Sequence, residues 1–142
     1  MGSIEDFLPH RPPFRFVDSL IRLFDDGAEC ELALTGDDPR LQQGRLAPLF
    51  LLEALAHTTA VFHGAQNTTS EKSPDSGMLV QIGDAQFFSS AHAGDRVFLH
   101  VKRVHSLGRF ARFAGVASVG DKPLVKADLT VVRELRDIDD AH

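Results

Sequence analysis

Hydrophobic residues are densest between Pro48 and His63, where the chain reads PLFLLEALAHTTAVFH. Pro48 suits the first turn of a helix, because its missing N–H has no intrahelical partner there, and Gly64 is a natural helix stop. Apolar residues occupy nearly every side of such a helix, which is typical of a buried helix. Glu53 and His57 interrupt the apolar pattern one turn apart, so they share a face.

Shorter segments on either side alternate between apolar and polar residues, as strands with one buried face do. Over 28–34, for example, Cys30, Leu32 and Leu34 fall on one face. Clusters of turn-forming residues separate these segments. We therefore predict strands over 14–24, 28–34, 78–88, 97–102, 109–119 and 126–131. We predict turns at 25–27, 35–39, 93–95, 106–108 and 120–123. The remaining segments are predicted as a short helical turn over 4–10, a connector over 40–47, a mobile polar loop over 64–77 and a frayed tail over 134–142.

This order gives two strands, one buried helix and then four strands in an antiparallel meander. A single long apolar helix needs a sheet curved around it to cover its sides, which is an α+β arrangement. One six-stranded sheet cannot cover every apolar face of this helix. We therefore predict at least a homodimer.

Length and composition narrow the class of protein. The 142 residues fit a single domain, 1–142, with a core of its own. One cysteine, Cys30, excludes a disulfide framework and a cysteine-based zinc site. The net charge of −5 argues against nucleic acid as the main partner. The N-terminus has no targeting pattern, and the longest apolar run, 46–56, is too short to span a membrane. These features favour a cytoplasmic protein.

Four segments carry a resemblance to a known family. They read LPHRPPFRFVD at 8–18, LEALAH at 52–57, GDAQF at 83–87 followed by AGD at 93–95, and FAGVA at 113–117 followed by GDK at 120–122. In this order they resemble the hotdog-fold β-hydroxyacyl-acyl-carrier-protein dehydratases of fatty-acid synthesis. The resemblance implies an α+β hotdog fold, in which a curved antiparallel sheet wraps one long central helix. It also implies an acyl thioester of acyl carrier protein or coenzyme A as ligand, assembly as a dimer or a multiple of dimers, and no cofactor.

Two positions depart from the family pattern. The family's Gly-His-Phe-Pro segment supplies a catalytic histidine, whereas this chain reads Gly-Asp-Asp-Pro at 36–39, with Asp37 or Pro39 at the histidine position. The family also has Pro-Gly at the helix start, where the glycine N–H polarises the thioester carbonyl. Here those positions hold Ala-Pro, and Pro48 has no N–H to donate. Glu53 keeps the register of the family's acidic residue.

Dehydration of a 3-hydroxyacyl thioester needs a base, an acid that protonates the departing hydroxyl, and N–H donors that stabilise the enolate. Glu53 can be the acid. His57 can be a structural hydrogen-bonding partner of Glu53, which we favour, or the replacement base. Asp37 can be that base or, more simply, a turn-capping residue.

We expect the acyl thioester to contact four apolar residues, Leu49, Phe50, Phe87 and Phe88. The backbone N–H groups of Leu49 and Phe50 lie at the positive end of the predicted helix and can serve as donors. No pair of histidines has a spacing that suggests a metal site. A basic rim that suits a carrier protein or the phosphates of coenzyme A could come from Arg40, Arg45, Lys102, Arg103, Arg109 and Arg112.

Three functions follow from these observations. The first is a dehydratase-like protein that acts on or binds 3-hydroxyacyl or enoyl thioesters. The second is an acyl-thioester hydrolase in which Glu53 activates water. The third is a non-catalytic subunit that pairs with an active dehydratase and supplies structure or half a site. The altered histidine and glycine positions favour this third function more than family membership alone would.

Overall fold

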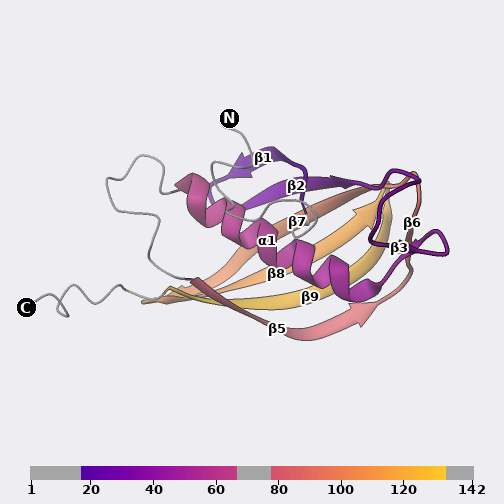
Figure 1. The fold of residues 1–142 in the computed structure, drawn as a ribbon. Coiled ribbons are helices and arrows are strands. Elements are labelled where there is room, and N and C mark those ends of the chain that lie inside the picture. Colours follow the sequence, from indigo (N-terminus) through magenta and orange to yellow (C-terminus); the bar gives the residue numbers. More distant parts are fainter. Residues whose placement is uncertain (1–16, 67–77, 134–142) are drawn as a thin grey trace, which may run out of the picture.

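A computed structural model of the protein describes residues 17–66 and 78–133. Figure 1 shows one long helix lying across the concave face of a curved sheet. The elements in chain order are β1 (Ser19–Phe24), β2 (Gly27–Ala33), β3 (Leu41–Gln42), β4 (Arg45–Leu46), α1 (Pro48–Gln66), β5 (Met78–Phe87), β6 (Ala91–His92), β7 (Arg96–Leu107), β8 (Phe110–Val119) and β9 (Lys122–Arg133). This is the sheet-around-a-helix arrangement that the sequence predicts.

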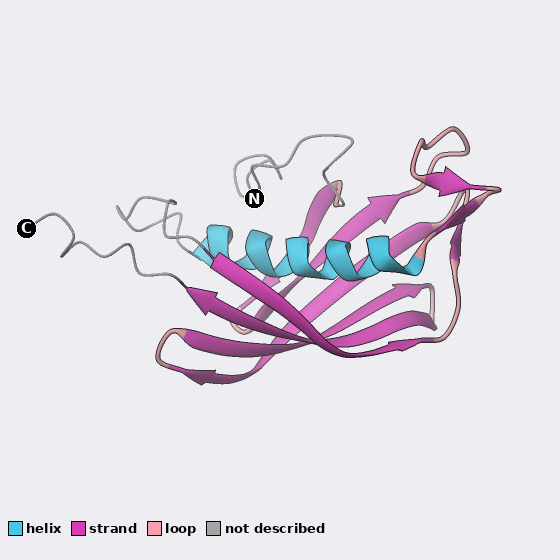
Figure 2. Ribbon diagram, turned by 60° about the horizontal axis from the view of Figure 1, so that its bottom comes forward, coloured by secondary structure: helices cyan, strands magenta, loops and turns pink. Residues whose placement is uncertain are grey.

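The large sheet is antiparallel and has the strand order β1-β2-β7-β8-β9-β5. Strands β7, β8 and β9 form the predicted meander. The prediction that β5 leads directly into this meander was wrong, because β5 pairs with β9 at the edge of the sheet, with Met78 opposite Arg133. Alternation along a strand fixes which residues face the core, but it does not fix which strand lies beside it. Figure 2 shows the sheet curving beneath the helix.

The alternating pattern correctly predicts the buried faces of the strands. Cys30, Leu32 and Leu34 are buried, whereas Ala33 between them is exposed. The core fills the space between the sheet and the helix, and its fully buried members include Leu32, Leu51, Leu55, Leu99 and Leu129. The helix is thereby packed against several strands of the sheet, most closely against β2 and β7.

Helix α1 begins at Pro48, as predicted, but it continues past the predicted stop to Gln66. Gly64 lies inside the last turn rather than after it. A glycine in a helix costs only about 1 kcal/mol relative to alanine, so the packing of the preceding turns against the sheet can carry the helix through this position. The predicted end at His63 was therefore one turn too early.

The predicted connector over 40–47 contains two short strands that the sequence does not reveal. Strands β3 and β4 pair with each other, and β4 pairs with β6, where Leu46 lies opposite Ala91. Both of these residues are buried. The small sheet lies at the N-terminal end of α1 (Figure 1), so it fixes the direction from which the chain enters the helix.

One stripe of α1 is not covered by the sheet. Leu49 is 64% exposed, and Glu53, Ala56, Ala60 and His63 are only partly buried. Because these five residues are three or four positions apart, they lie along one side of the helix, and we call them the open stripe. The prediction of a helix buried all round holds only for the sides that face the sheet.

Several predicted features lie outside the described residues. They are the helical turn over 4–10, the first part of the strand over 14–24 with most of the LPHRPPFRFVD segment, the portion 67–77 of the predicted loop, and the tail over 134–142.

Candidate active site

Helix α1 places Glu53 in its second turn, on the open stripe. The side chain is partly buried among apolar neighbours. No described residue donates a hydrogen bond to its carboxylate or forms an ion pair with it. A carboxylate on an apolar face is unfavourable unless a polar group meets it. The position of Glu53 therefore suits contact with a ligand or a subunit that packs against the stripe.

His57 lies one turn after Glu53, and only 8% of it is exposed. The hydrogen bond that we expected between the two side chains is not formed in the described part of the chain. Burial of His57 leaves little of its imidazole accessible to a substrate. Its position favours a structural role over that of a base, although its partner is not Glu53.

The start of α1 offers fewer backbone donors than the sequence suggests. The N–H of Phe50 donates to the carbonyl oxygen of Ala47 at 3.0 Å, so it is already used within the first turn. Pro48 has no N–H. Of the two donors that we predicted, the N–H of Leu49 alone has no backbone acceptor among the described residues. An enolate would therefore need further donors from elsewhere.

The segment at the family's histidine position forms a turn held by its own side chains. The Asp37 carboxylate accepts a hydrogen bond from the Thr35 hydroxyl at 2.7 Å. Arg40 donates from Nε and from Nη2 to the two carboxylate oxygens of Asp38, at 2.9 and 2.6 Å. These hydrogen bonds from Arg40 hold the pKa of Asp38 below its usual value. Asp37 is exposed, and its contacts are those of a turn-capping residue.

The apolar residues predicted to contact substrate are largely on the surface. Phe87 and Phe88 are 52% and 54% exposed, and Leu49 is exposed as well. Phe87 ends β5, whose end lies near the start of α1 in both views of the fold (Figures 1 and 2). The Lys126 ammonium lies 5.9 Å from the centre of the Phe88 ring. These residues are available to an apolar ligand or to a second subunit.

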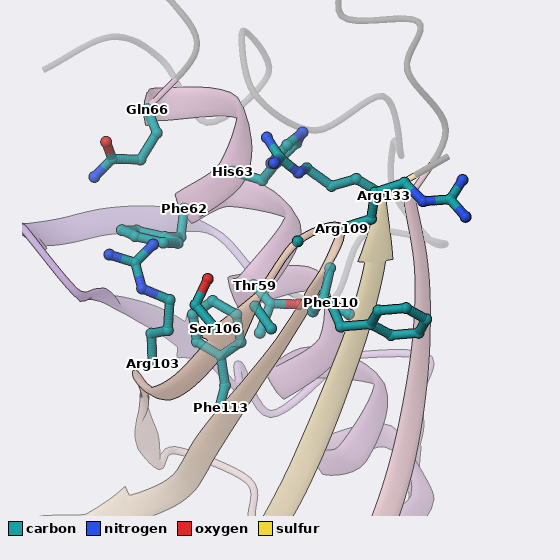
Figure 3. A pocket seen from close by; sticks show the side chains of 13 residues that line it. Thr59, Phe62, His63, Gln66, Arg103, Ser106, Arg109, Phe110, Phe113 and Arg133 are labelled. Carbon is teal, nitrogen blue, oxygen red and sulfur yellow. The ribbon is translucent and has the colours of Figure 1, made fainter. Parts of the chain in front are cut away.

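A pocket of about 260 Å³ lies at the other end of the helix, between the last turns of α1 and the ends of β7, β8 and β9 (Figure 3). It contains none of the predicted catalytic or substrate-binding residues. Its lining consists of Thr59, Phe62, His63, Gln66, Arg103, Ser106, Gly108, Arg109, Phe110, Ala111, Phe113, Val131 and Arg133.

The predicted basic rim is brought together only in part. Arg103 and Arg109 line the pocket, but the other four predicted cations do not. Arg40 is engaged by Asp38. His63 and Arg133 also line the pocket, and we did not predict them as members of this group, because they join it from the end of α1 and the end of β9.

The described residues include no group of three or more histidine, cysteine or acidic side chains that could hold a metal ion. Within the same residues, no helix has the length and apolar character needed to cross a membrane.

Comparison with solved structures places this arrangement among known folds. A chain of the dehydratase heterocomplex ApeI:P from Xenorhabdus doucetiae superimposes with a TM-score of 0.85 at 18% identity, covering 96% of this chain and 93% of that one. A hypothetical thioesterase protein with coenzyme A from Streptococcus pneumoniae has the same fold, with a TM-score of 0.64 at 9% identity over 81% of this chain and 86% of that one. The hotdog fold predicted from the sequence is thus confirmed.

Sequence comparison is more specific. The chain is 28% identical over 136 residues to the 3-hydroxyacyl-[acyl-carrier-protein] dehydratase FabZ of Saccharophagus degradans, covering 89% of this chain and 92% of that protein. It is 29% identical over 134 residues to the enzyme of the same name from Anaeromyxobacter dehalogenans, with 89% and 85% coverage. The family model for ApeP-like proteins, described as ApeP dehydratase, matches residues 2–141. With its hotdog fold and a family match over nearly its whole length, the chain belongs to the ApeP-like dehydratase family.

Proposed function

We propose that this chain binds 3-hydroxyacyl or enoyl thioesters and supplies Glu53 to a composite dehydratase site, which a histidine-bearing subunit of the same fold completes. One observation carries the proposal. Glu53 lies on the open stripe of α1, and no described residue forms a hydrogen bond or an ion pair with its carboxylate.

The need for a second subunit follows from the missing base. Asp37 is exposed and accepts a hydrogen bond from Thr35, and His57 is buried. Neither is well placed to take a proton from a substrate at Glu53. A histidine from a partner subunit would restore the base, and the existence of a dehydratase heterocomplex of two different chains, ApeI:P, supports this arrangement.

The open stripe is the surface on which we place that partner. It joins the apolar side chains of Leu49, Ala56 and Ala60 to the carboxylate of Glu53. Packing a second subunit here would bury apolar surface and bring its residues to Glu53 in the same step. Without such a partner, we expect two copies of this chain to pair through the same surface as a homodimer.

The proposed reaction divides the proton transfers between the two subunits. The partner's histidine removes a proton from the carbon next to the thioester carbonyl. Glu53 gives its proton to the 3-hydroxyl, which leaves as water with the electrons of the C–O bond, and an enoyl thioester remains. General acid catalysis of this kind contributes about 10²- to 10⁴-fold to a rate.

The test compares the chain alone with the chain mixed with an intact, histidine-bearing dehydratase subunit of the same fold. Enoyl absorbance and thiol release are followed together, with 3-hydroxyacyl and enoyl thioesters of carrier protein and of coenzyme A. We expect the rate in the mixture to exceed that of either protein alone. We expect Glu53→Gln to lower this added rate at least ~100-fold while light scattering shows that the assembly is retained.

Two variants serve as controls in the same assay. Asp37→Asn keeps an oxygen that can accept from Thr35, so it should leave the rate unchanged. His57→Gln should also be tolerated if His57 is structural. Wild-type rates in Glu53→Gln, or a rate in the mixture no greater than that of the partner alone, would refute the proposal. If the chain alone releases thiol, and Glu53→Gln abolishes this release, the result would instead support the second function, an acyl-thioester hydrolase in which Glu53 activates water.

A further inference from the structure

The hairpin formed by β7 and β8 differs in charge from the rest of the chain. Residues 96–119 contain five of the chain's 15 lysines and arginines and none of its 20 aspartates and glutamates. Four of these five cations lie in the half of the hairpin that leads to its turn, namely Lys102, Arg103, Arg109 and Arg112. Positive charge is thus concentrated on one hairpin of a chain whose net charge is −5.

The end of this hairpin, residues 104–110, is exposed throughout. Three of its side chains are large and apolar: Val104 is 50% exposed, Leu107 is 70% exposed and Phe110 is 52% exposed. Leu107 has the highest exposed fraction among the large apolar residues that the structure describes. A single exposed apolar side chain is ordinary, whereas a group of them marks an interaction surface. We therefore asked what kind of partner the hairpin end fits.

Strand pairing arranges the apolar side chains in a row. Leu107 lies opposite Phe110, and Phe110 lies opposite Val132 of β9. Residues directly opposite each other on neighbouring strands share a face of the sheet and are in contact. Phe113 faces the helix, where its ring meets that of Phe62, so Phe110, three positions earlier, faces outward. Figure 3 shows the Phe110 ring pointing away from Phe62. The apolar row thus lies on the outer side of the sheet, opposite α1.

A polar row lies behind the apolar row on the same face. In it, His105 lies opposite Arg112, and Arg112 lies opposite Thr130. Each of the three is two positions from a member of the apolar row, so the rows are roughly 7 Å apart at ~3.3 Å per residue. His105 and Arg112 are exposed. In this register the first acidic residue, Asp128, is one row further from the hairpin end, and the acidic turn between β1 and β2 lies on the other side of β7 from β8.

We infer that the end of the β7–β8 hairpin docks reversibly on an anionic lipid surface, with Leu107 and Phe110 in the outermost hydrocarbon and Arg112 among the lipid phosphates. Apolar area and attraction to anionic lipids act together at such surfaces. Apolar groups of surface-bound proteins lie about 5–10 Å deep, and the spacing of the two rows then puts the cations at the level of the headgroups.

The shape of the hairpin end favours lipid over a folded protein. A bilayer deforms around a projecting hairpin, whereas a protein would need a hollow that matches it. Acidic residues elsewhere on the chain are largely screened from the bilayer beyond ~8 Å at physiological ionic strength. This contact needs no membrane-spanning helix, and it uses the side of the sheet opposite the open stripe, so it is compatible with the composite site around Glu53.

Vesicle flotation with the full chain tests the inference. One set of vesicles is phosphatidylcholine with about one third phosphatidylglycerol, and the other is phosphatidylcholine alone. We expect the chain to bind the anionic vesicles at least ~10-fold more tightly than the neutral ones, because several cations contribute. Binding to the anionic vesicles should weaken as the salt concentration rises.

Matched variants separate the hairpin end from the rest of the surface. The double variant Leu107→Ser/Phe110→Ser should weaken binding to anionic vesicles at least ~10-fold. Phe88→Ser removes an equally exposed phenylalanine beyond the end of β5 and should change binding less than ~2-fold. Arg112→Gln should weaken binding about 5-fold, whereas Arg22→Gln, at an exposed arginine of β1, should leave it within ~2-fold. Circular dichroism verifies that each variant is folded.

A fluorescent label gives a second measurement that does not depend on the double variant. Cys30 is fully buried, so a polarity-sensitive dye reacts with the introduced thiol of Leu107→Cys in the native chain. Its emission should shift to the blue when anionic vesicles are added. The same dye on Lys122→Cys, at the exposed opposite end of the β8–β9 pair, should show no shift.

Three results would overturn the inference. The first is no binding to anionic vesicles at low salt. The second is equal weakening by Phe88→Ser and by the double variant, or equal dye shifts at positions 107 and 122. The third is binding of an acidic carrier protein that the double variant abolishes, with no binding to vesicles, which would assign the hairpin end to a protein partner.

Discussion

Gly115 on β8 lies so close to Leu55 of helix α1 that a Cβ on the glycine would be 3.4 Å from both Leu55 methyl carbons and 2.8 Å from Cδ1 of Leu129. The helix rests on the sheet where a side chain is missing. We expect Gly115→Ala to lower the free energy of unfolding by about 1–3 kcal/mol, the usual cost of overpacking. Urea denaturation measures this. Unchanged or increased stability would show that the helix can shift without loss.

Gly27 at the start of β2 is more restricted, because a Cβ there would lie 2.0 Å from the backbone oxygen of Val101. A backbone carbonyl inside a strand pair cannot move aside as a side-chain methyl can. Gly27→Ala should therefore destabilise the protein more than Gly115→Ala does. Gly83→Ala on β5 is the matched control, since a Cβ there meets nothing within 4 Å, and it should change stability by less than about 0.5 kcal/mol. Equal losses of unfolding free energy in Gly27→Ala and Gly83→Ala would contradict this account.

Cys30 faces the core from β2 and is fully buried. Burial raises the pKa of its thiol to about 12, against a smaller opposing effect of a hydrogen bond with Thr58. The thiolate is the reactive form, so we expect almost no reaction with a thiol reagent at pH 8 in the native protein. In denaturant, one thiol per chain should react at once. Rapid labelling of the native protein would mean that β2 opens readily.

His63 makes stability depend on pH. Burial, with a further contribution from Arg133, holds the pKa of His63 below the 6.5 of an unperturbed histidine. The unfolded chain therefore binds the proton more readily, and the contribution of His63 to stability is lost as pH falls from 6.5 through the lower folded-state value. We expect the difference in unfolding free energy between wild type and His63→Gln to shrink over this range. A difference that stays constant from pH 7.5 to about 5 would count against this.

Much of the fold could be predicted because alternation and helical periodicity are local. The buried face of β2 and the start of α1 at Pro48 followed from them. The short strands β3, β4 and β6 could not, because two-residue strands leave no period to detect. The place of β5 beside β9 depends on pairing between distant segments, which one sequence does not display.

The candidate site, like the fold, was predictable only where local sequence pattern decides it. The place of Glu53 in the second turn of α1 could be predicted from the helical segment alone. Its lack of a bond to His57 could not, because spacing predicts proximity and not the rotamers that decide a hydrogen bond. The arginine pocket was missed for another reason. Arg133 and Arg109 are far apart in sequence and meet only where β9 ends beside the β7–β8 turn.

The strand order β1-β2-β7-β8-β9-β5 also determines when, during synthesis, the strands that bury the apolar side of α1 become available. When α1 leaves the ribosome, only β1 and β2 of the large sheet exist, and Gly27 of β2 must still pair with Lys102, more than half the chain away. Strand β9, which packs on the helix and holds β5 in place, is made last. Contacts of such long range form slowly. The nascent chain thus exposes its most apolar segment while the second half of the chain is made, when chaperones or an already folded subunit would protect it most.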